Sequence, residues 1–331
     1  MQYANINNLL FIMENLYKTI LHSKRANIYY LEHCRILVNG GRVEYVTDQG
    51  KESFYWNIPI ANTTCLLLGS GTSITQAAVR ELAAAGVMMG FCGGNGTPLF
   101  AATEVEWLSP QSEYRPTEYL QQWCSKWFDD TWRFQAALSL QNKRLNYIEK
   151  FWAKHDWQVD MSQVLALCQA FRNEFKQAKT LTSLLTAEGR MSKSLYSQAI
   201  RASRYWQVNF VREHGKNSDK ANQFLDHGNY LAYGLAASAC WVLGLPHALA
   251  VLHGKTRRGG LVFDIADLIK DAVILPLAFI SAQNGVSSSE FRIACTDCFT
   301  RYEVLDLMID SIKEIAASEW KNEHSFNQSM S

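Results

Sequence analysis

The sequence predicts an α+β fold, in which a small N-terminal β-rich domain is followed by a larger all-α C-terminal domain. Short apolar and β-branched segments separated by turn residues fill residues 19–108, whereas residues 118–331 carry apolar side chains at helical spacing. Residues 109–117 hold two of the six prolines and are expected to link the domains. The chain has 331 residues, enough for two domains of about 150 residues each. Residues 1–18 are expected to form an N-terminal extension.

The β-rich domain is expected to contain an early hairpin. Residues 35–38 are apolar after Arg35, residues 39–41 (Asn-Gly-Gly) supply a turn, and residues 42–46 alternate polar and apolar as a half-buried strand does. One helix is expected at residues 72–85, because a Thr cap precedes it and Gly86 ends it. Four further strands are expected at residues 27–31, 58–60, 65–68 and 87–91.

The segments after Pro116 have a helical pattern, and one of them resembles a membrane span. Residues 228–254 contain no Asp, Glu, Lys or Arg. Polar residues interrupt this stretch, and Pro246 should end a helix of about 18 residues that begins near Asp226. We therefore expect a buried helix in a cytoplasmic protein, with no membrane partner. The expected helical segments are residues 118–157, 161–179, 181–210, 226–245, 260–283 and 289–319.

Two common binding signatures are missing from the sequence. Of the eight cysteines only Cys295 and Cys298 are close together, so a four-ligand zinc site lacks its second pair. Scattered thiols in apolar surroundings are typical of reduced, cytoplasmic cysteines. The segment at residues 69–71 (Gly-Ser-Gly) lacks the third glycine of a dinucleotide loop and the lysine of a phosphate-binding loop, which favours a tight turn.

An acidic pair on a predicted helix is the most informative chemical feature. Asp264 and Asp267 stand three residues apart among apolar neighbours, so both carboxylates project from one face of a largely buried helix. Buried carboxylates need a metal ion or bound cations. His253 lies before a glycine-containing turn upstream, and a histidine with carboxylates suits Mg²⁺ or Mn²⁺. The residues alone leave a second interpretation open, a surface network in which the two acids pair with Arg257, Arg258 or Lys270.

The near-neutral charge of the chain hides an uneven distribution. Lys and Arg number 32 against 31 Asp and Glu, a formal charge of +1. Residues 188–220 carry seven bases and three acids, whereas residues 290–323 carry four bases and eight acids. A basic band beside a carboxylate–histidine cluster suits a phosphate-bearing polymer held over a metal, although a solvated helix face would carry the same charges. Near-neutrality therefore excludes only a uniformly basic protein.

Over nearly the whole chain from about Thr19, the sequence resembles the CRISPR-associated integrases, metal-dependent endonucleases that insert new spacers. The resemblance is closest to their type I-F branch. The segments that carry it are long and therefore specific, and they are residues 21–26, 55–62, 107–116, 222–233 and 252–264.

The resemblance implies an active site and a cofactor. It places metal-binding residues at Glu188, His253 and Asp267, with Asp264 as an additional active-site acid, and it implies Mg²⁺ or Mn²⁺. Glu188 is identified in this way only, because a glutamate in an amphipathic helix is otherwise typical of a solvated face. The implied reaction is transesterification, in which a 3′-hydroxyl of protospacer DNA attacks a phosphodiester at the edge of a CRISPR repeat.

The resemblance also implies partners. Lys255, Arg257 and Arg258 would neutralise DNA phosphates near the cut, with Arg190 and Lys193 as further DNA-binding residues. The substrates would be double-stranded or branched DNA. The β-rich domain would form a homodimer, and a small ferredoxin-like adaptation protein, fused to the helicase-nuclease in type I-F systems, would bridge the dimers.

Two other functions would fit parts of the pattern. A different helical metalloenzyme acting on a diphosphate would normally carry a second acidic helix, and the sequence shows none of comparable spacing. A non-catalytic DNA-binding or scaffold subunit would not need His253, Asp264 and Asp267 together.

Overall fold

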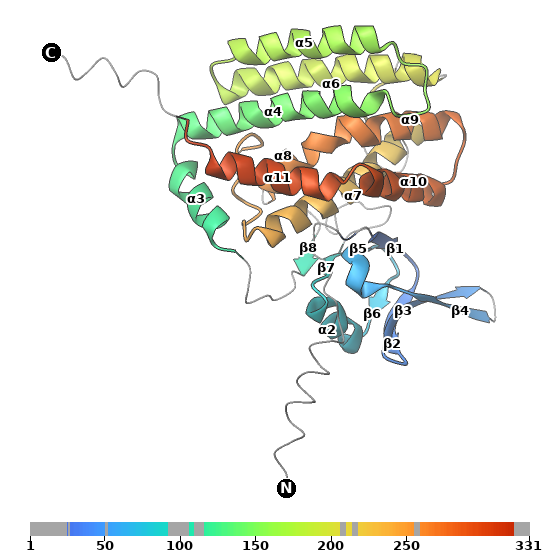
Figure 1. Ribbon diagram of the computed structural model, residues 1–331. Coiled ribbons are helices and arrows are strands. Elements are labelled where there is room, and N and C mark those ends of the chain that lie inside the picture. The colour runs from blue at the N-terminus through green and yellow to red at the C-terminus, as the bar shows by residue number, and fades with distance from the viewer. Residues whose placement is uncertain are drawn as a thin grey trace, which may run out of the picture.

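The computed structural model describes residues 25, 27–49, 52–91, 106–108, 116–205, 210–213, 218–254 and 259–320. Within these residues a β-rich region precedes a helical region, as the sequence predicts, and the helices lie over the two sheets (Figure 1). The expected N-terminal extension and most of the expected linker fall outside the described residues.

The first sheet is mainly parallel and lies next to the helices. Its strand order is β1-β5-β7-β8, in which β1, β5 and β7 are parallel and β8 is antiparallel. All six residues of β5 are buried, because the sheet is covered on both faces, and the last four, Cys65–Leu68, are accordingly a continuous apolar run. The strands are β1 (Asn27–Leu31), β5 (Thr63–Leu68), β7 (Met88–Phe91) and β8 (Glu106–Leu108).

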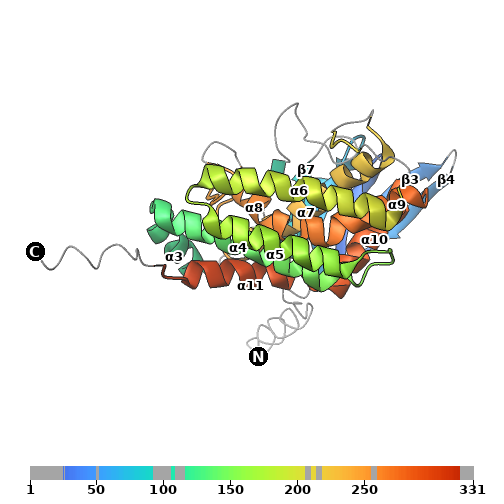
Figure 2. The same ribbon diagram turned by 90° about the horizontal axis from the view of Figure 1, so that it is seen from above.

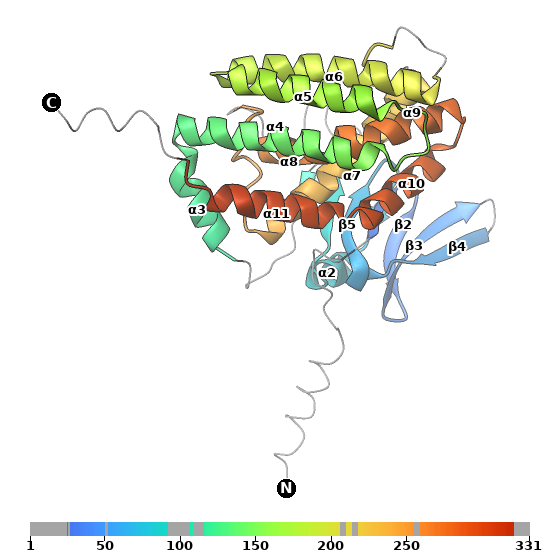
Figure 3. The ribbon, with the colours of Figure 1, turned by 45° about the horizontal axis from the view of Figure 1, so that its top comes forward.

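The second sheet contains the predicted hairpin. Gly40 and Gly41 both have positive φ, +54° and +78°, which a two-residue hairpin turn requires. The strand order is β4-β3-β2-β6, and the β3–β4 arm projects away from the helices (Figure 3). The strands are β2 (Arg35–Asn39), β3 (Arg42–Gln49), β4 (Glu52–Asn57) and β6 (Ser73–Ile74).

Two predictions for this region are wrong in detail. The strand expected at residues 58–60 is absent: β4 lies just before it, and Ile60–Asn62 form a 3₁₀ turn. The helix expected from Thr72 begins later, as α2 (Gln76–Ala84), because the Thr75 hydroxyl accepts the amide of Ala78 and caps it.

The helical region is built in layers. Helices α4, α5, α6 and α11 run with nearly aligned axes, and α5 and α6 lie on the side away from the sheets (Figures 1 and 2). Helix α7 lies on the sheet side. The elements are α3 (Glu118–Trp127), α4 (Asp130–Trp152), α5 (Met161–Gln177), α6 (Leu181–Ser203), α7 (Lys220–Val242), α8 (Gly260–Ile269), the π-helical turn η4 (Lys270–Ile274), α9 (Leu275–Gln283), α10 (Ser288–Arg301) and α11 (Val304–Ala317).

Helix α7 contains the uncharged stretch that the sequence predicts to form a buried helix. It begins earlier than expected, because Asp219 caps it by accepting the amide of Asn222, and Gly244 (φ +74°) follows its end. No helix in the described part of the chain is long and apolar enough to cross a membrane.

The β-rich and helical regions share one core. Ile28, Cys65 and Met88 of the first sheet belong to the same cluster of buried side chains as α4, α7 and α8. A Cβ atom at Gly234 of α7 would lie 3.2 Å from the Cys65 sulfur, so the missing side chain lets the helix approach β5 closely.

A π-helical turn interrupts the helical segment predicted at residues 260–283. The amide of Leu275 donates to the carbonyl of Lys270, five residues back, and Pro276 has no amide to offer the carbonyl of Ala272. Donors come from Trp152, the last residue of α4, and from His155, which follows the helix. Trp152 Nε1 donates to the carbonyl of Asp271 (2.8 Å), and the His155 ring bonds to that of Ala272 (3.2 Å).

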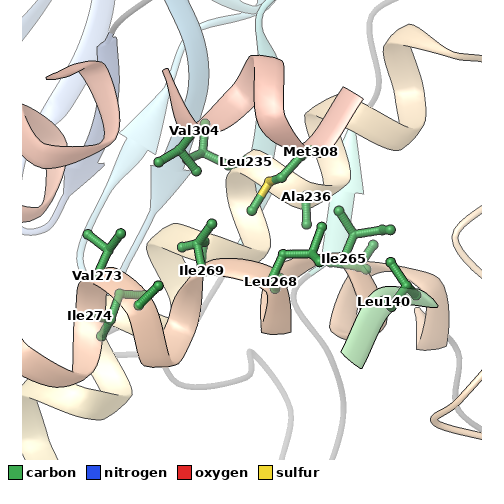
Figure 4. Close-up of a cluster of buried hydrophobic side chains, with 14 of the residues drawn as sticks. Leu140, Leu235, Ala236, Ile265, Leu268, Ile269, Val273, Ile274, Val304 and Met308 are labelled. Carbon is green, nitrogen blue, oxygen red and sulfur yellow. The ribbon is translucent and has the colours of Figure 1, made fainter. Parts of the chain in front are cut away.

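The apolar face of α8 packs against three other helices. Ile265, Leu268 and Ile269 lie against side chains of α4, α7 and α11 (Figure 4). Because these positions follow helical spacing, Asp264 and Asp267 are left together on the remaining face.

Candidate active site

Asp264 is a buried carboxylate whose oxygens are fully engaged. Its Oδ2 accepts the backbone amides of Val251 (2.6 Å) and Leu252 (3.0 Å), and its Oδ1 accepts the amide of His253 (3.0 Å). Its side chain is 0% exposed. Asp264 therefore fixes the backbone at residues 251–253 and is less accessible to solvent than His253.

His253 is oriented by Asp264 and faces Asp267. Its Nδ1 lies 2.7 Å from Asp264 Oδ1, and since an ionised carboxylate only accepts, Nδ1 carries the proton. Nε2 then points toward Asp267 Oδ2, at 3.5 Å. Burial lowers the pKa of the imidazole, but the contacts with Asp264 and Asp267 outweigh it, and the pKa lies above its ordinary value.

Asp267 is held ionised by surrounding cations. Lys270 Nζ donates to its Oδ1 at 2.6 Å, and Arg144 Nη1 lies 4.0 Å from its Oδ2. Burial raises the pKa of this carboxyl, but Lys270, Arg144 and His253 together lower it to about 2. The second interpretation of the sequence is thus met in part, because Asp267 pairs with Lys270, whereas Asp264 accepts from amides and His253.

Glu188 joins the cluster from a different helix. It lies on α6, and its Oε1 accepts a hydrogen bond from Arg144 Nη1 at 2.9 Å and one from the Ser192 hydroxyl at 3.3 Å. Its side chain is 19% exposed, the same degree of access as His253 at 20%. The structure therefore brings together Glu188, His253, Asp264 and Asp267.

Two residues of the cluster, Arg144 and Asp271, were not predicted from the sequence. Arg144 of α4 is buried, and its Nε donates to Asp271 Oδ2 at 2.6 Å, while Nη2 contacts the same oxygen. A signal for Arg144 exists in the sequence, because it stands four residues from both Leu140 and Ile148, on the apolar face of its helix. Asp271 is spaced four residues from Asp267 and so shares its face.

Two of the predicted DNA-binding residues, both on α6, make no hydrogen bond or ion pair with this cluster in the part of the chain that the structure describes. Arg190 and Lys193 are on the exposed face of α6, and Arg190 is paired with Glu174. Lys255, Arg257 and Arg258 fall outside the described residues, so their role stays a prediction.

The fit of the cluster to a divalent cation depends on the spacing of its side chains and on their donor chemistry. Among the residues described, no group of three or more His, Cys, Asp or Glu side chains is spaced to hold a metal ion, since Arg144 and Lys270 occupy the carboxylates. The donor chemistry nevertheless fits. Four carboxylates face two permanent cations, a formal charge of −2 when His253 is neutral, and two carboxylates with an imidazole nitrogen suit Mg²⁺ or Mn²⁺. His253 also has its second nitrogen held by a carboxylate, the usual arrangement for a metal-binding histidine.

The fold and the cluster define an α+β protein with a buried carboxylate–histidine centre between helices. The sequence profile described as CRISPR associated protein Cas1 matches residues 29–314. A protein named CRISPR-associated endonuclease Cas1 from Pseudomonas aeruginosa (strain UCBPP-PA14) is 60% identical over 310 residues, which cover 90% of this chain and 95% of that protein. The chain belongs to the Cas1 family.

Solved structures show the same fold. A CAS1 protein from Thermotoga maritima superposes with a TM-score of 0.70 at 15% identity, covering 88% of this chain and 96% of that one. A casposase bound to its integration product superposes with a TM-score of 0.67 at 12% identity, covering 89% and 92%.

Proposed function

We propose that this protein is a metal-dependent DNA endonuclease and integrase of CRISPR adaptation, which inserts protospacer DNA into the repeat array by transesterification. The observation that carries the proposal is the convergence of Glu188, His253 and Asp267 from separate segments in a chain of the Cas1 family. A same-fold casposase bound to an integration product supports the integration step by analogy.

Glu188, His253 Nε2 and Asp267 are the residues that would hold Mg²⁺ or Mn²⁺. When bound, such a cation polarises a phosphodiester and makes a neighbouring hydroxyl more acidic. Since one phosphodiester bond replaces another, the reaction needs no nucleoside triphosphate as an energy source.

Asp264 is assigned the positioning of His253. With three amides and His253 Nδ1 on its two oxygens, Asp264 is poorly placed to accept a proton from a substrate hydroxyl. By holding the proton on Nδ1 it leaves Nε2, beside Asp267, as the nitrogen that would bind the cation.

Basic residues that follow Glu188 and His253 in the chain would hold the DNA backbone. Arg190 and Lys193 follow Glu188 on the exposed face of α6, where they would meet phosphates that approach the site from solvent. Lys255, Arg257 and Arg258 follow His253 in the chain and are proposed to neutralise phosphates nearest the cut.

A homodimer through the β-rich region is part of the proposal. Strand β4 is an edge of its sheet, and Tyr55 and Trp56 are 56% and 51% exposed on it. An exposed aromatic edge strand favours pairing with another chain. The proposed further partner is the small ferredoxin-like adaptation protein, fused to the helicase-nuclease in type I-F systems.

The proposal is tested by incubating the purified protein with branched DNA and Mn²⁺. The wild type should cleave and join strands, and a chelator should abolish both reactions. Asp267→Asn, which keeps the shape of the side chain, should lower the rate by at least about 100-fold. Asp310→Ala removes an exposed carboxylate from α11 and is the matched control, expected to keep wild-type activity.

Each outcome separates the candidate functions. Normal activity of Asp267→Asn would contradict the site assignment. Activity that survives chelation would contradict the metal-dependent mechanism. DNA binding by the wild type without any strand cleavage or joining would favour the alternative, a non-catalytic scaffold subunit.

A further inference from the structure

Glu188 reaches the cluster through a single buried arginine. Glu188 lies on α6, whereas His253 and Asp267 belong to the segment that includes α8. Arg144, on α4, donates Nη1 to Glu188 Oε1 at 2.9 Å and places the same nitrogen 4.0 Å from Asp267 Oδ2. One guanidinium nitrogen thus faces both carboxylates that come from different helices.

The orientation of that guanidinium is set by Asp271. Arg144 Nε and Nη2 both contact Asp271 Oδ2, so two of the three nitrogens are fixed and the plane of the group is determined. Nη1, the third nitrogen, then points toward Glu188 and Asp267, with Gln141 Oε1 also 3.5 Å away. The side chains of Arg144 and Asp271 are 4% and 9% exposed, so water does not screen the pair.

The backbone of Asp271 is itself fixed by α4. Its carbonyl is freed by the π-helical turn and accepts Trp152 Nε1 at 2.8 Å. Side chain and main chain of Asp271 are therefore both tied to the helix that carries Arg144. An ordinary ion pair that only offsets charge would not need this second attachment.

We propose that Arg144 and Asp271 form a positioning pair, in which Asp271 orients the guanidinium and Arg144 holds Glu188 facing Asp267 so that one divalent cation can bind between them. The inference rests on the proposed metal centre. Asp271 also offsets the charge of Arg144, which lowers the repulsion between the guanidinium and a cation bound by Glu188 and Asp267.

The proposal is tested by measuring Mn²⁺ binding to the full chain without DNA, from the electron paramagnetic resonance signal of free Mn²⁺. Arg144→Lys keeps the charge but loses the planar fork, and Asp271→Asn keeps the shape but loses the charge that holds Arg144. Each should weaken Mn²⁺ binding by about 10-fold or more. Glu149→Gln removes the acid of the Arg172–Glu149 pair between α4 and α5 and is the matched control, expected to bind as the wild type does.

Thermal unfolding without metal is recorded for every variant, because a purely structural pair would change stability and leave Mn²⁺ affinity unchanged. Wild-type affinity in either folded variant would overturn the proposal, and so would the loss of fold in both, since the pair would then serve stability alone. Absence of Mn²⁺ binding by the wild type would instead overturn the proposed metal centre, and this inference with it.

Discussion

Helices α7 and α8 pack against each other in one core, but they are buried by opposite means. Residues 228–242 of α7 carry no charge, and small residues such as Gly228 and Gly234 let neighbours approach its backbone. Helix α8 buries Asp264 and Asp267, and each acid is matched by groups from elsewhere in the chain. Helix α7 should therefore tolerate no added volume at these positions, whereas α8 should tolerate no loss of its buried polar atoms.

The largest effect is expected from removing Asp264. In Asp264→Ala the amides of Val251, Leu252 and His253 lose their acceptor, and a buried unpaired amide costs about 1–3 kcal/mol. We expect the free energy of unfolding to fall by about 3–5 kcal/mol, measured by urea denaturation. Asp267→Asn is the comparison, since Lys270 can turn to solvent, and it should lose far less. Equal losses in the two variants would contradict the distinction between a structural and a ligating acid on α8.

Low pH is expected to destabilise the fold around α7 and around the turn after α8, because each of these places buries a neutral histidine. His227 on α7 and His155, which contacts the turn after α8, have pKa values lowered to about 4, mainly by burial. In the unfolded chain these groups take up protons near pH 6.5, so below that pH the unfolded state binds more protons and stability falls until about pH 4.

For each histidine the loss at pH 5 relative to pH 7 should be about 2 kcal/mol. Urea denaturation of the wild type and of His155→Gln at both pH values isolates one of them from the titrating carboxylates. If the variant lost as much stability as the wild type between pH 7 and pH 5, His155 would not be the group that resists protonation.

The smallest effects are expected from two glycines, with opposite signs. A Cβ at Gly228 would lie 2.4 Å from Ile274 Cγ2, and overpacking of this kind typically costs about 1–3 kcal/mol. Alanine is a better helix former than glycine by about 1 kcal/mol, so Gly228→Ala should lose about 1–2 kcal/mol net. Gly189 of α6 has nothing within 4 Å of its Cβ position, and Gly189→Ala should gain up to about 1 kcal/mol. Thermal unfolding of the two variants measures the difference in stability. An increase in stability in both would show that α7 can accept a side chain at residue 228.

Sequence patterns predicted elements well where burial is one-sided or complete. The all-buried run of β5 and the uncharged run of α7 were both recognisable. Strand β4 was missed because all six of its residues are exposed, so no alternation of apolar and polar positions marks it. The sequence pattern instead predicts a strand at residues 58–60, which is wrong.

Local sequence spacing could predict only those parts of the candidate site that lie close together in the chain. Asp264 and Asp267 share a face by helical geometry, and Glu188 was identified only through the family resemblance. Arg144 and Asp271 are 127 residues apart in the chain, so no local pattern links them. The π-helical turn had a signal in Pro276, but its effect depends on Trp152 and His155 taking over the freed carbonyls.

The close packing of α7 on β5, where Gly234 meets Cys65, affects how the two regions unfold. Because β1, β5 and β7 are covered on one side by the helices, the sheet cannot keep its core once α7 leaves. Native-state hydrogen exchange should therefore show the amides of β5 and of α7 opening with the same free energy, as one cooperative unit that crosses the boundary between the β-rich and helical regions.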